Sequence, residues 1–414
     1  MGVRLTQVGI QLIEAAVAGQ RTLDGNCWGQ KDIAAAAGID ERTYRRLLKG
    51  DAGRTTVAAV CQALGIKLED VVAIVEPDKS GQLVTVSTVR VGPNPFEYGK
   101  CVTGDRFCGR ERELKFIRDR LSKGTSVSLI GLRRIGKTSL LQHLVKEKAS
   151  LLANAEKLML VYLDLSTPVG QTPETVIEGL RRGIEKQISR APWKSEENAD
   201  PWAFQDGLED VRDRGYQVVV MLDEFEAIER RLDLFQEWGN DWRSKASTGE
   251  LFTLMTASYR SLTDFYKSHQ RTSPFDNIFN PLEVGVMAES DWGEMVKSGF
   301  GERLTTDVLD WIDSVAGGLP YFVQAAASAL WDCDLAIEPA EDLYFKQVEG
   351  RFEMLWRDLN DVERSSLRSV VDGNSIDTRK GVGDRLLRYG FLRQDGRLFS
   401  SMFGEWIREN GGGI

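Results

Sequence analysis

Short apolar runs alternate with segments of helical period over residues 105–288, which predicts strands alternating with helices. The run VVVML at 218–222 is continuously apolar, as expected for a strand buried on both faces of a parallel sheet. The expected strands are 126–132, 157–166, 216–225, 250–258 and 281–287. This alternation predicts an α/β domain in which helices cover both faces of a mostly parallel sheet, giving three layers.

The pattern changes on both sides of this domain. Residues 1–75 form short, alanine-rich segments of helical period, which predict an all-α N-terminal domain. Residues 76–104 mix Pro, Gly, Ser and β-branched residues without that period and predict an extended linker. After residue 288 the pattern is mainly helical, and the segment 391–400 predicts a hairpin around an Asp-Gly turn.

Composition narrows the classes of protein to consider. The 414 residues are 42% hydrophobic and 28% charged, which excludes a wholly disordered chain. The net charge of −9 excludes a uniformly basic nucleic-acid coat protein, although the nine basic and eight acidic side chains of residues 1–75 allow a local basic face. Five scattered cysteines and two distant histidines, His143 and His269, argue against zinc sites and disulfides. Because no apolar run is long enough to span a bilayer, we expect a cytoplasmic protein with reduced thiols and no membrane partner.

The segment GLRRIGKTS at 131–139 fulfils the pattern GxxxxGK[ST] between an expected strand and an expected helix. Its glycines allow backbone N–H groups to face phosphate oxygens, and the N-terminus of the helix adds a favourable dipole. We expect Lys137 to contact the β- and γ-phosphates of a nucleotide and the Thr138 hydroxyl to ligate Mg²⁺. The predicted nucleotide-binding residues of this loop are Gly131, Arg133, Arg134, Gly136, Lys137, Thr138 and Ser139.

Two acids, Asp223 and Glu224, end the continuously apolar strand farther along the chain. Ligands bind at the carboxyl ends of the strands in open α/β sheets. We therefore expect Asp223 to hold Mg²⁺, usually through water, and Glu224 to polarise the attacking water as a general base. The structural alternative is an acid pair that caps a helix.

Two arginines near the following strands are candidates for contact with the γ-phosphate. Arg260 lies two residues after the strand that ends at Ser258, where a cation could sense the γ-phosphate or position the attacking water. With Glu224 and Lys137 it makes up the predicted catalytic set. Arg271 could reach a neighbouring subunit as an arginine finger. For both arginines the alternative is an exposed side chain in a solvated loop.

Four segments together resemble the STAND class of P-loop ATPases, in its archaeal-type, AAA-like branch related to AAA+ proteins. They are FCGRE at 107–111, GLRRIGKTSLL at 131–141, LDEFE at 222–226 and GGLPY at 317–321. The resemblance covers about 105–414 and implies adenine or ribose contacts near Phe107, Gly109 and Arg110. It also implies that a helical lid contacts the nucleotide at Pro320. From chemistry alone, GGLP is a helix-breaking turn.

The same resemblance divides the chain after the linker into a P-loop ATPase domain, 105–288, a helical lid, 289–338, and a winged-helix domain, 339–414. Within the winged-helix domain it implies a helix at 379–390, a wing hairpin at 391–401 and a closing helix at 402–410. Many STAND proteins hold ADP with a winged-helix histidine. This chain has no histidine after residue 269, so its resting state departs from that pattern.

The segment 30–50 predicts two helices joined by a tight turn at Gly38, with Asp40 capping the second helix. The apolar stripe that joins them consists of Ile33, Ile39, Tyr44 and Leu47. The pattern resembles the Cro-type repressor helix-turn-helix over 5–75, which implies a recognition helix at 41–49. The side chains expected to contact DNA are Glu41, Arg42, Arg45, Arg46 and Lys49. The alternatives are a solvated helix face and a protein-binding adaptor.

These features predict an ATP-binding and ATP-hydrolysing molecular switch of slow turnover, with ATP/ADP and Mg²⁺ as its cofactors. Its nucleotide state would control conformation or self-assembly, and the N-terminal domain would act on DNA in the regulation of transcription, defence or mobile elements. A single helix-turn-helix covers one half-site, so we expect self-association. One alternative is an AAA+-like DNA-processing ATPase, such as a loader or transposition helper. The other is a signalling scaffold whose N-terminal domain binds protein, with a protein partner as its trigger.

Overall fold

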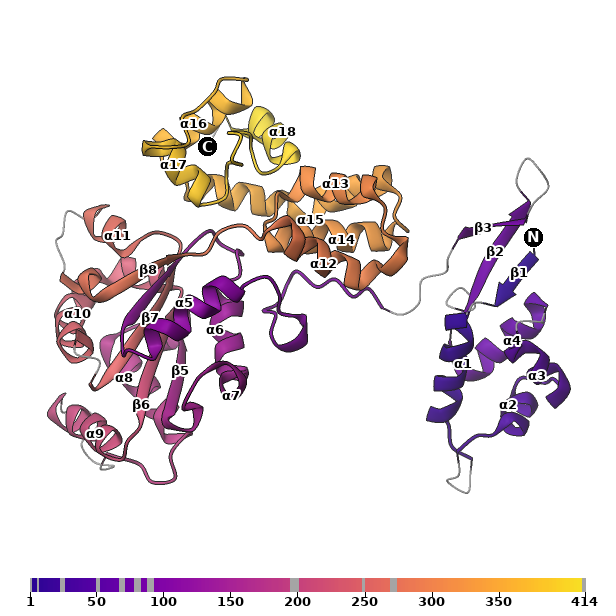
Figure 1. Ribbon diagram of the computed structural model, residues 1–414, viewed down its shortest axis with the longest axis horizontal. Helices are drawn as coiled ribbons and strands as arrows, with labels where there is room; N and C mark the ends of the chain where they lie inside the picture. Colours follow the sequence, from indigo (N-terminus) through magenta and orange to yellow (C-terminus); the bar gives the residue numbers. More distant parts are fainter. Residues whose placement is uncertain are drawn as a thin grey trace. The chain divides into compact units, whose positions relative to one another are not determined.

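In the computed structural model the chain forms two compact units, Met1–Asn94 and Pro95–Ile414. Figure 1 shows the helices and strands of both units. The structure describes residues 2–5, 7–22, 27–49, 53–66, 71–77, 83–87, 93–193, 201–247, 250–268 and 274–411. Within these ranges, no helix combines the length and the apolar character needed to cross a membrane.

The helices of the N-terminal unit are α1 (Gln7–Gly19), α2 (Gln30–Ala36), α3 (Glu41–Leu48) and α4 (Arg54–Leu64). Between α2 and α3, Gly38 has φ 66°, a left-handed conformation that glycine adopts without strain. Asp40 caps α3, because its Oδ1 accepts a hydrogen bond from the Thr43 N–H at 2.9 Å. The core of this unit includes Tyr44 and Leu47, which are buried against α2.

A three-stranded antiparallel sheet also belongs to the N-terminal unit. Its strands are β1 (Gly2–Leu5), β2 (Val72–Pro77) and β3 (Leu83–Ser87), in the order β1-β2-β3. The prediction of an all-α N-terminal domain is therefore wrong. Both later strands are rich in β-branched residues, which favour extended backbone, and pairing with β1 satisfies their backbone groups. The strand β3 lies inside the segment for which the sequence predicts an extended linker.

The larger unit contains a sheet of five parallel strands in the order β5-β6-β7-β4-β8. They are β4 (Ser126–Ile130), β5 (Leu158–Asp164), β6 (Gln217–Asp223), β7 (Phe252–Ser258) and β8 (Phe279–Glu283). The predicted parallel α/β arrangement is confirmed. The last strand ends earlier than expected because the chain leaves the sheet after Val284, and the Met287 N–H bonds to the Gly318 carbonyl instead.

Helices cover both faces of this sheet (Figure 1). Successive residues of β6 point to opposite sides of the sheet: Met221 packs in one core with Leu140, and Val220 packs in the other with Leu180. The helices of this domain are α5 (Glu111–Leu121), α6 (Lys137–Lys146), α7 (Lys148–Leu151), α8 (Pro173–Glu185), α9 (Pro201–Asp213), α10 (Leu232–Ser247) and α11 (Leu262–Ser268). The 3-10 turns are Gly104–Arg106, Ala155–Lys157, Pro168–Gly170, Phe225–Arg231, Pro274–Ile278 and Gly301–Arg303.

After β8 the chain is helical. The first helices are α12 (Glu289–Phe300), α13 (Thr306–Ala316), α14 (Pro320–Asp332) and α15 (Ile337–Asp358). Gly317 and Gly318 both have positive φ, and a Cβ on Gly318 would lie 2.7 Å from the Met287 carbonyl oxygen. Pro320 follows as the first residue of α14, where its missing N–H is not needed. The GGLP segment is therefore a tight turn that brings the start of α14 to the edge of the α/β domain.

The last helices are α16 (Asp361–Val371), α17 (Gly381–Arg388) and α18 (Ser401–Asn410). Between α17 and α18, Leu392 pairs with Leu398 in an antiparallel bridge, and Gly396 has φ 83°. The predicted hairpin is thus present at its Asp-Gly turn. The assignment of this region as a winged helix stays a prediction.

Candidate nucleotide-binding site

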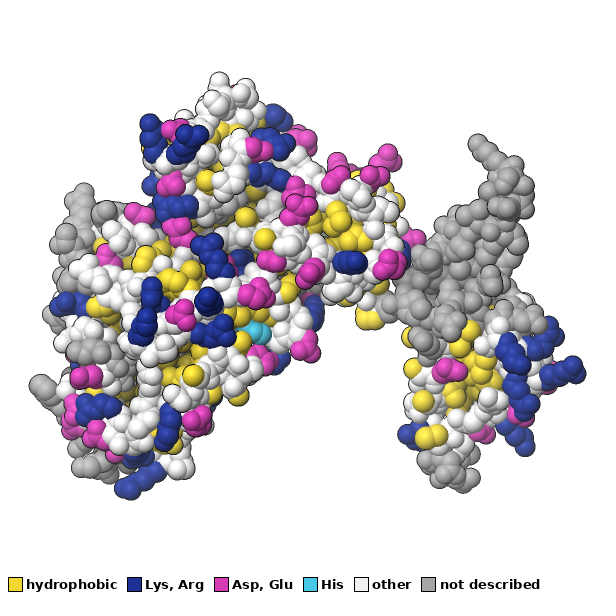
Figure 2. Space-filling view, viewed as in Figure 1, with side chains coloured by type: hydrophobic (Ala, Val, Ile, Leu, Met, Phe, Trp, Pro, Cys, Tyr) yellow, Lys and Arg dark blue, Asp and Glu magenta, His cyan; other side chains and the backbone are white. Residues whose placement is uncertain are grey.

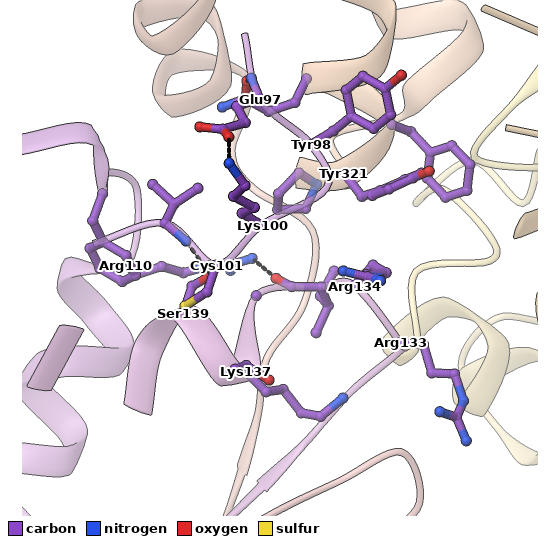
Figure 3. Close-up of a pocket in the computed structure, with 18 of the residues that line it drawn as sticks. Glu97, Tyr98, Lys100, Cys101, Arg110, Arg133, Arg134, Lys137, Ser139 and Tyr321 are labelled. Carbon is purple, nitrogen blue, oxygen red and sulfur yellow. Dashed lines mark hydrogen bonds and ion pairs between the residues drawn. The ribbon is translucent and has the colours of Figure 1, made fainter. Parts of the chain in front are cut away.

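A cavity of about 500 Å³ lies at the carboxyl edge of the parallel sheet. It is lined by the loop before α6, the ends of β5 and β6, the segment 97–108 and the helices α14 and α15. This volume lies within the range of about 300–1,000 Å³ that is usual for small-molecule sites. Figure 3 shows the side chains that gather around it.

The loop between β4 and α6 has the backbone that its motif demands. A Cβ on Gly131 would lie 2.5 Å from the Val284 carbonyl oxygen, and Gly136 has φ 104°, so both positions require glycine. The Lys137 ammonium donates hydrogen bonds to the carbonyls of Gly131, at 2.7 Å, and Leu132, at 3.0 Å. Burial lowers the pKa of Lys137, while the nearby carboxylates of β6 and of the turn after it oppose that shift. A cation therefore lies inside the curve of the loop.

Oxygen atoms suited to Mg²⁺ meet at the end of β6. The Thr138 hydroxyl donates to Asp223 Oδ2 at 2.7 Å, and the Tyr162 hydroxyl donates to the same oxygen at 2.8 Å. Asp223 is only 1% exposed, and its Oδ1 accepts the Glu224 N–H at 2.9 Å. Hard oxygen donors fit Mg²⁺, which usually takes one or two carboxylates and completes its shell with water and phosphate. Thr138 and Asp223 would hold the ion; within the described ranges no cluster of three or more His, Cys, Asp or Glu side chains suits a metal.

Glu224 differs from Asp223 in its surroundings. Its backbone is left-handed, with φ 51°, which is unfavourable for a non-glycine residue and is often found at functional sites. Burial raises the pKa of Glu224, and the charge of Glu226 raises it further, against the opposing effects of Lys137 and Arg133. A carboxylate with a raised pKa at the edge of a cavity is suited to take a proton from water.

Arg133 connects this site to the end of α15. Its Nε donates to Asp358 Oδ2 at 2.9 Å, and its Nη1 lies 3.5 Å from a carboxylate oxygen of Glu224. The Asp358 carbonyl accepts hydrogen bonds from the Arg260 guanidinium, at 3.0 Å, and from the Tyr259 hydroxyl, at 3.3 Å. Arg260 thus contacts α15 and is not among the residues that line the cavity.

Two further arginines lie around the ring of Tyr321 at the start of α14. The Arg134 guanidinium lies 5.9 Å from the ring centroid, and that of Arg351, on α15, lies 5.6 Å from it. Arg134 extends toward Tyr321 while Arg133 extends away from it (Figure 3). Both Arg134 and Arg351 line the cavity, and within the described part of the chain neither forms an ion pair with a carboxylate. Uncompensated cations of this kind favour an anionic ligand.

The residues expected to contact the nucleoside, and Pro320 of the expected lid, occupy different surroundings. Phe107, Arg110 and Pro320 line the cavity. The Arg110 side chain is only 5% exposed and donates to the carbonyls of Ile135 and Gly285, both at 2.9 Å, so it braces the loop from behind. Gly109 packs behind the wall of the cavity, where a Cβ would lie 2.6 Å from a side-chain carbon of Met287.

Sequence reasoning does not single out Tyr162, Arg351 or the segment 97–102. Tyr162 could have been found, because Tyr162 and Asp164 are alternate residues of one strand and so share a face of the sheet. Both line the cavity. The segment 97–102 and Arg351 carry no such pattern, since packing between distant parts of the chain brings them to the cavity.

The side chains expected to contact DNA lie on α3 in the N-terminal unit, apart from Lys49, which directly follows this helix. Four of them are exposed: Arg42, Arg45, Arg46 and Lys49. Glu41 is partly buried and pairs with Arg45, which also donates to the Gln30 side chain at 3.3 Å. Figure 2 shows basic side chains gathered on this unit. Arg271 lies outside the described residues, so its expected role stays a prediction.

The five-stranded parallel sheet, the phosphate-binding loop between β4 and α6, and the acid at the end of β6 define an α/β P-loop NTPase fold. Similar solved structures include the Walker-type ATPase PABY2304 of Pyrococcus abyssi, with a TM-score of 0.51, 16% identity, and coverage of 72% of this chain and 95% of that one. Another is the Aeropyrum pernix ORC1 protein in complex with DNA, with a TM-score of 0.43, 12% identity, and coverage of 74% and 94%. At these identities the likeness concerns the fold. No protein-family model matches the sequence, and no curated protein matches it.

Proposed function

We propose that this protein is an AAA-like ATPase that binds and hydrolyses Mg·ATP in the cavity and acts on DNA. One observation carries the ATPase assignment: Lys137, Thr138 and the acids that end β6 converge on one cavity. A P-loop with a buried Asp beside its hydroxyl residue is the arrangement that holds Mg²⁺ and triphosphate. A raised-pKa carboxylate follows directly in the chain, where an attacking water has to be activated.

The chain's residues would divide the reaction between them. Lys137 and the loop amides bind the β- and γ-phosphates and stabilise the charge that develops during transfer. Mg²⁺, when bound, neutralises phosphate charge and orients the γ-phosphate. Glu224 accepts the proton of the attacking water, and Tyr162 holds the Asp223 carboxylate in place. Arg134 and Arg351 add positive charge beside the phosphates.

The action on DNA is proposed for the exposed cations of α3. Arginine and lysine side chains on an exposed helix can contact phosphates and, in the major groove, base edges. The net charge of −9 favours binding that depends on a specific local surface over strong, non-specific attachment.

A pair of variants tests the ATPase assignment. We expect Lys137→Ala to lose nucleotide binding, and Glu224→Gln to bind ATP while its hydrolysis falls at least about a hundredfold. Calorimetry measures binding, and phosphate release measures hydrolysis. Lys123→Ala and Glu409→Gln, both at exposed positions, are the matched controls. Normal turnover in the Glu224→Gln protein would contradict the role given to this residue.

A nucleotide-controlled switch is a second candidate function, and the contacts of Asp358 favour it. Arg133 joins the end of α15 to the phosphate-binding loop, and Arg260 joins it to the residues after β7. A change at the γ-phosphate would therefore alter the contacts of the C-terminal helices. Sedimentation with ATP, with ADP, and with ATP plus duplex DNA separates the two candidates. Assembly only with ATP and DNA together supports a DNA-processing ATPase, whereas a change with ATP alone supports the switch.

A further inference from the structure

One face of α6 supports the segment that leads to Phe107. Ser139, His143 and Lys146 are spaced four and three residues apart, so they lie on the same side of the helix. The Val102 N–H donates to the Ser139 hydroxyl at 3.1 Å, and the Gly104 N–H donates to His143 Nδ1 at 3.2 Å. The helix that begins at the phosphate-binding loop therefore also supports the part of the cavity wall that contains Val102 and Phe107.

The His143 imidazole contacts the ring of Phe107 at the end of this segment. It is stacked on this ring, with the ring centroids 4.0 Å apart and the planes 10° from parallel. Phe107 lines the cavity, whereas His143 lies behind it and is only 8% exposed. The position and tilt of the Phe107 ring thus depend on the imidazole.

The hydrogen bond from Gly104 fixes the protonation state of this histidine. A backbone N–H can only donate, so Nδ1 must carry no proton. In a protonated imidazole the Nδ1–H would face the Gly104 N–H, and two donors cannot form a hydrogen bond. Burial lowers the pKa of His143, and the charge of Lys146 lowers it too, while Glu147 raises it. Lys146 and Glu147 are the charged groups that act on the ring; the opposing segment presents the Phe107 ring and the Gly104 amide. At neutral pH the ring is therefore uncharged.

We infer that His143 is a positioning residue for the nucleoside end of the ligand: its neutral imidazole holds Gly104 and Phe107 in the arrangement that receives a planar base. This inference rests on the proposed function, since it assumes that the cavity binds a nucleotide. The phosphate-binding loop leads into the N-terminus of α6 whereas His143 lies in its last turn, so a phosphate chain bound at the loop would not need this contact. Protonation of His143 therefore weakens the binding of nucleotides and leaves the binding of a phosphate chain without a base unchanged.

The test compares two ligands at two values of pH. ADP and tripolyphosphate are titrated by calorimetry without Mg²⁺ at pH 8.0 and pH 5.5, using the full chain and its His143→Asn and His143→Ala variants. The asparagine side chain offers an acceptor that does not titrate. Because the phosphates of ADP titrate in the same way with every variant, the difference between the wild type and His143→Asn isolates the imidazole.

We expect the wild type to lose more ADP affinity than His143→Asn on acidification to pH 5.5, but by less than about tenfold, because the pKa of His143 lies below its ordinary 6.5 and limits how much of the imidazole is protonated there. At pH 8.0, His143→Asn should bind ADP within about threefold of the wild type, and His143→Ala about tenfold more weakly than the wild type. Tripolyphosphate should bind equally to all three proteins. Circular dichroism checks that each variant is folded; where His143→Ala is not, the pH profile of His143→Asn decides.

Two results would overturn the inference. One is a parallel loss of ADP affinity in the wild type and in His143→Asn; the other is an equal effect of the variants on ADP and on tripolyphosphate. Failure of the proposed function is a different result, because then the wild type binds neither ligand, or Lys137→Ala binds both as well as the wild type does.

Discussion

Tyr162 controls the Asp223 carboxylate through a single hydroxyl. Burial raises the pKa of Tyr162, so the hydroxyl keeps its proton and donates throughout the physiological range. We expect Tyr162→Phe to leave Asp223 less well oriented. Mg²⁺-dependent hydrolysis should then fall about tenfold, and the Mg²⁺ concentration needed for half-maximal rate should rise. The free energy of unfolding should fall by about 1 kcal/mol. Phosphate release over a Mg²⁺ titration measures both effects. Tyr216→Phe, outside the cavity, is the control, and an unchanged Mg²⁺ requirement would contradict this role.

The raised pKa of Glu224 predicts the pH at which the hydrolysis rate falls on acidification. A general base works only when ionised, so a raised pKa moves the loss of activity on acidification to a higher pH than the ordinary value of 4.5 gives. Because Glu226 contributes to the shift, we expect Glu226→Gln to move that limb to lower pH. Rates measured from pH 4.5 to pH 8 test this. A limb that moves upward or stays in place would show that Glu226 does not act on the base.

At the scale of elements, the proposed switch requires that the contact between the phosphate-binding loop and α15 carries the response of the C-terminal helices to nucleotide. Asp358→Asn keeps the shape of the side chain and removes the charge that pairs with Arg133. We expect it to reduce by at least half the difference in hydrogen exchange between the ATP and ADP states over α15 and α16, at a stability change of about 1 kcal/mol or less. Asp361→Asn, at a fully exposed side chain, is the control. An exchange difference as large as that of the wild type would mean that the contact is not a coupling element.

The elements also show which parts of the fold follow from local sequence. The five parallel strands and the loop before α6 are predictable, because a continuous apolar run and a glycine motif each reflect a local physical demand. The N-terminal sheet is not predictable in this way, since β1 and β2 lie far apart in the sequence. Only their pairing satisfies the backbone hydrogen-bonding groups of both strands. The site divides in the same way. Lys137 and Asp223 belong to local patterns, whereas Arg351 and His143 gain their roles from contacts between distant segments.

For the whole molecule, DNA binding is expected to depend on the cations of α3. Arg42→Ala and Lys49→Ala should each weaken binding to duplex DNA and lower the slope of log affinity against log salt by about one for each lost phosphate contact. Fluorescence anisotropy at several salt concentrations, with ATP and with ADP, measures this. Lys123→Ala, an exposed lysine of the larger unit, is the control. Absence of salt-sensitive binding in every nucleotide state would exclude DNA as the partner of this helix.

Because α15 is long, a small movement at Asp358 would produce a larger movement at the other end of the helix. This helix is a single rod of 22 residues and therefore about 33 Å long. Near its start Tyr344 packs on Trp311 of α13, and near its end Trp356 packs on Trp406 of α18. A rod pivoting by about 10° at the end that touches the phosphate-binding loop moves its other end by about 6 Å. A shift too small to alter the sheet would thus become a displacement comparable to one helical turn, and α15 would serve as a lever arm.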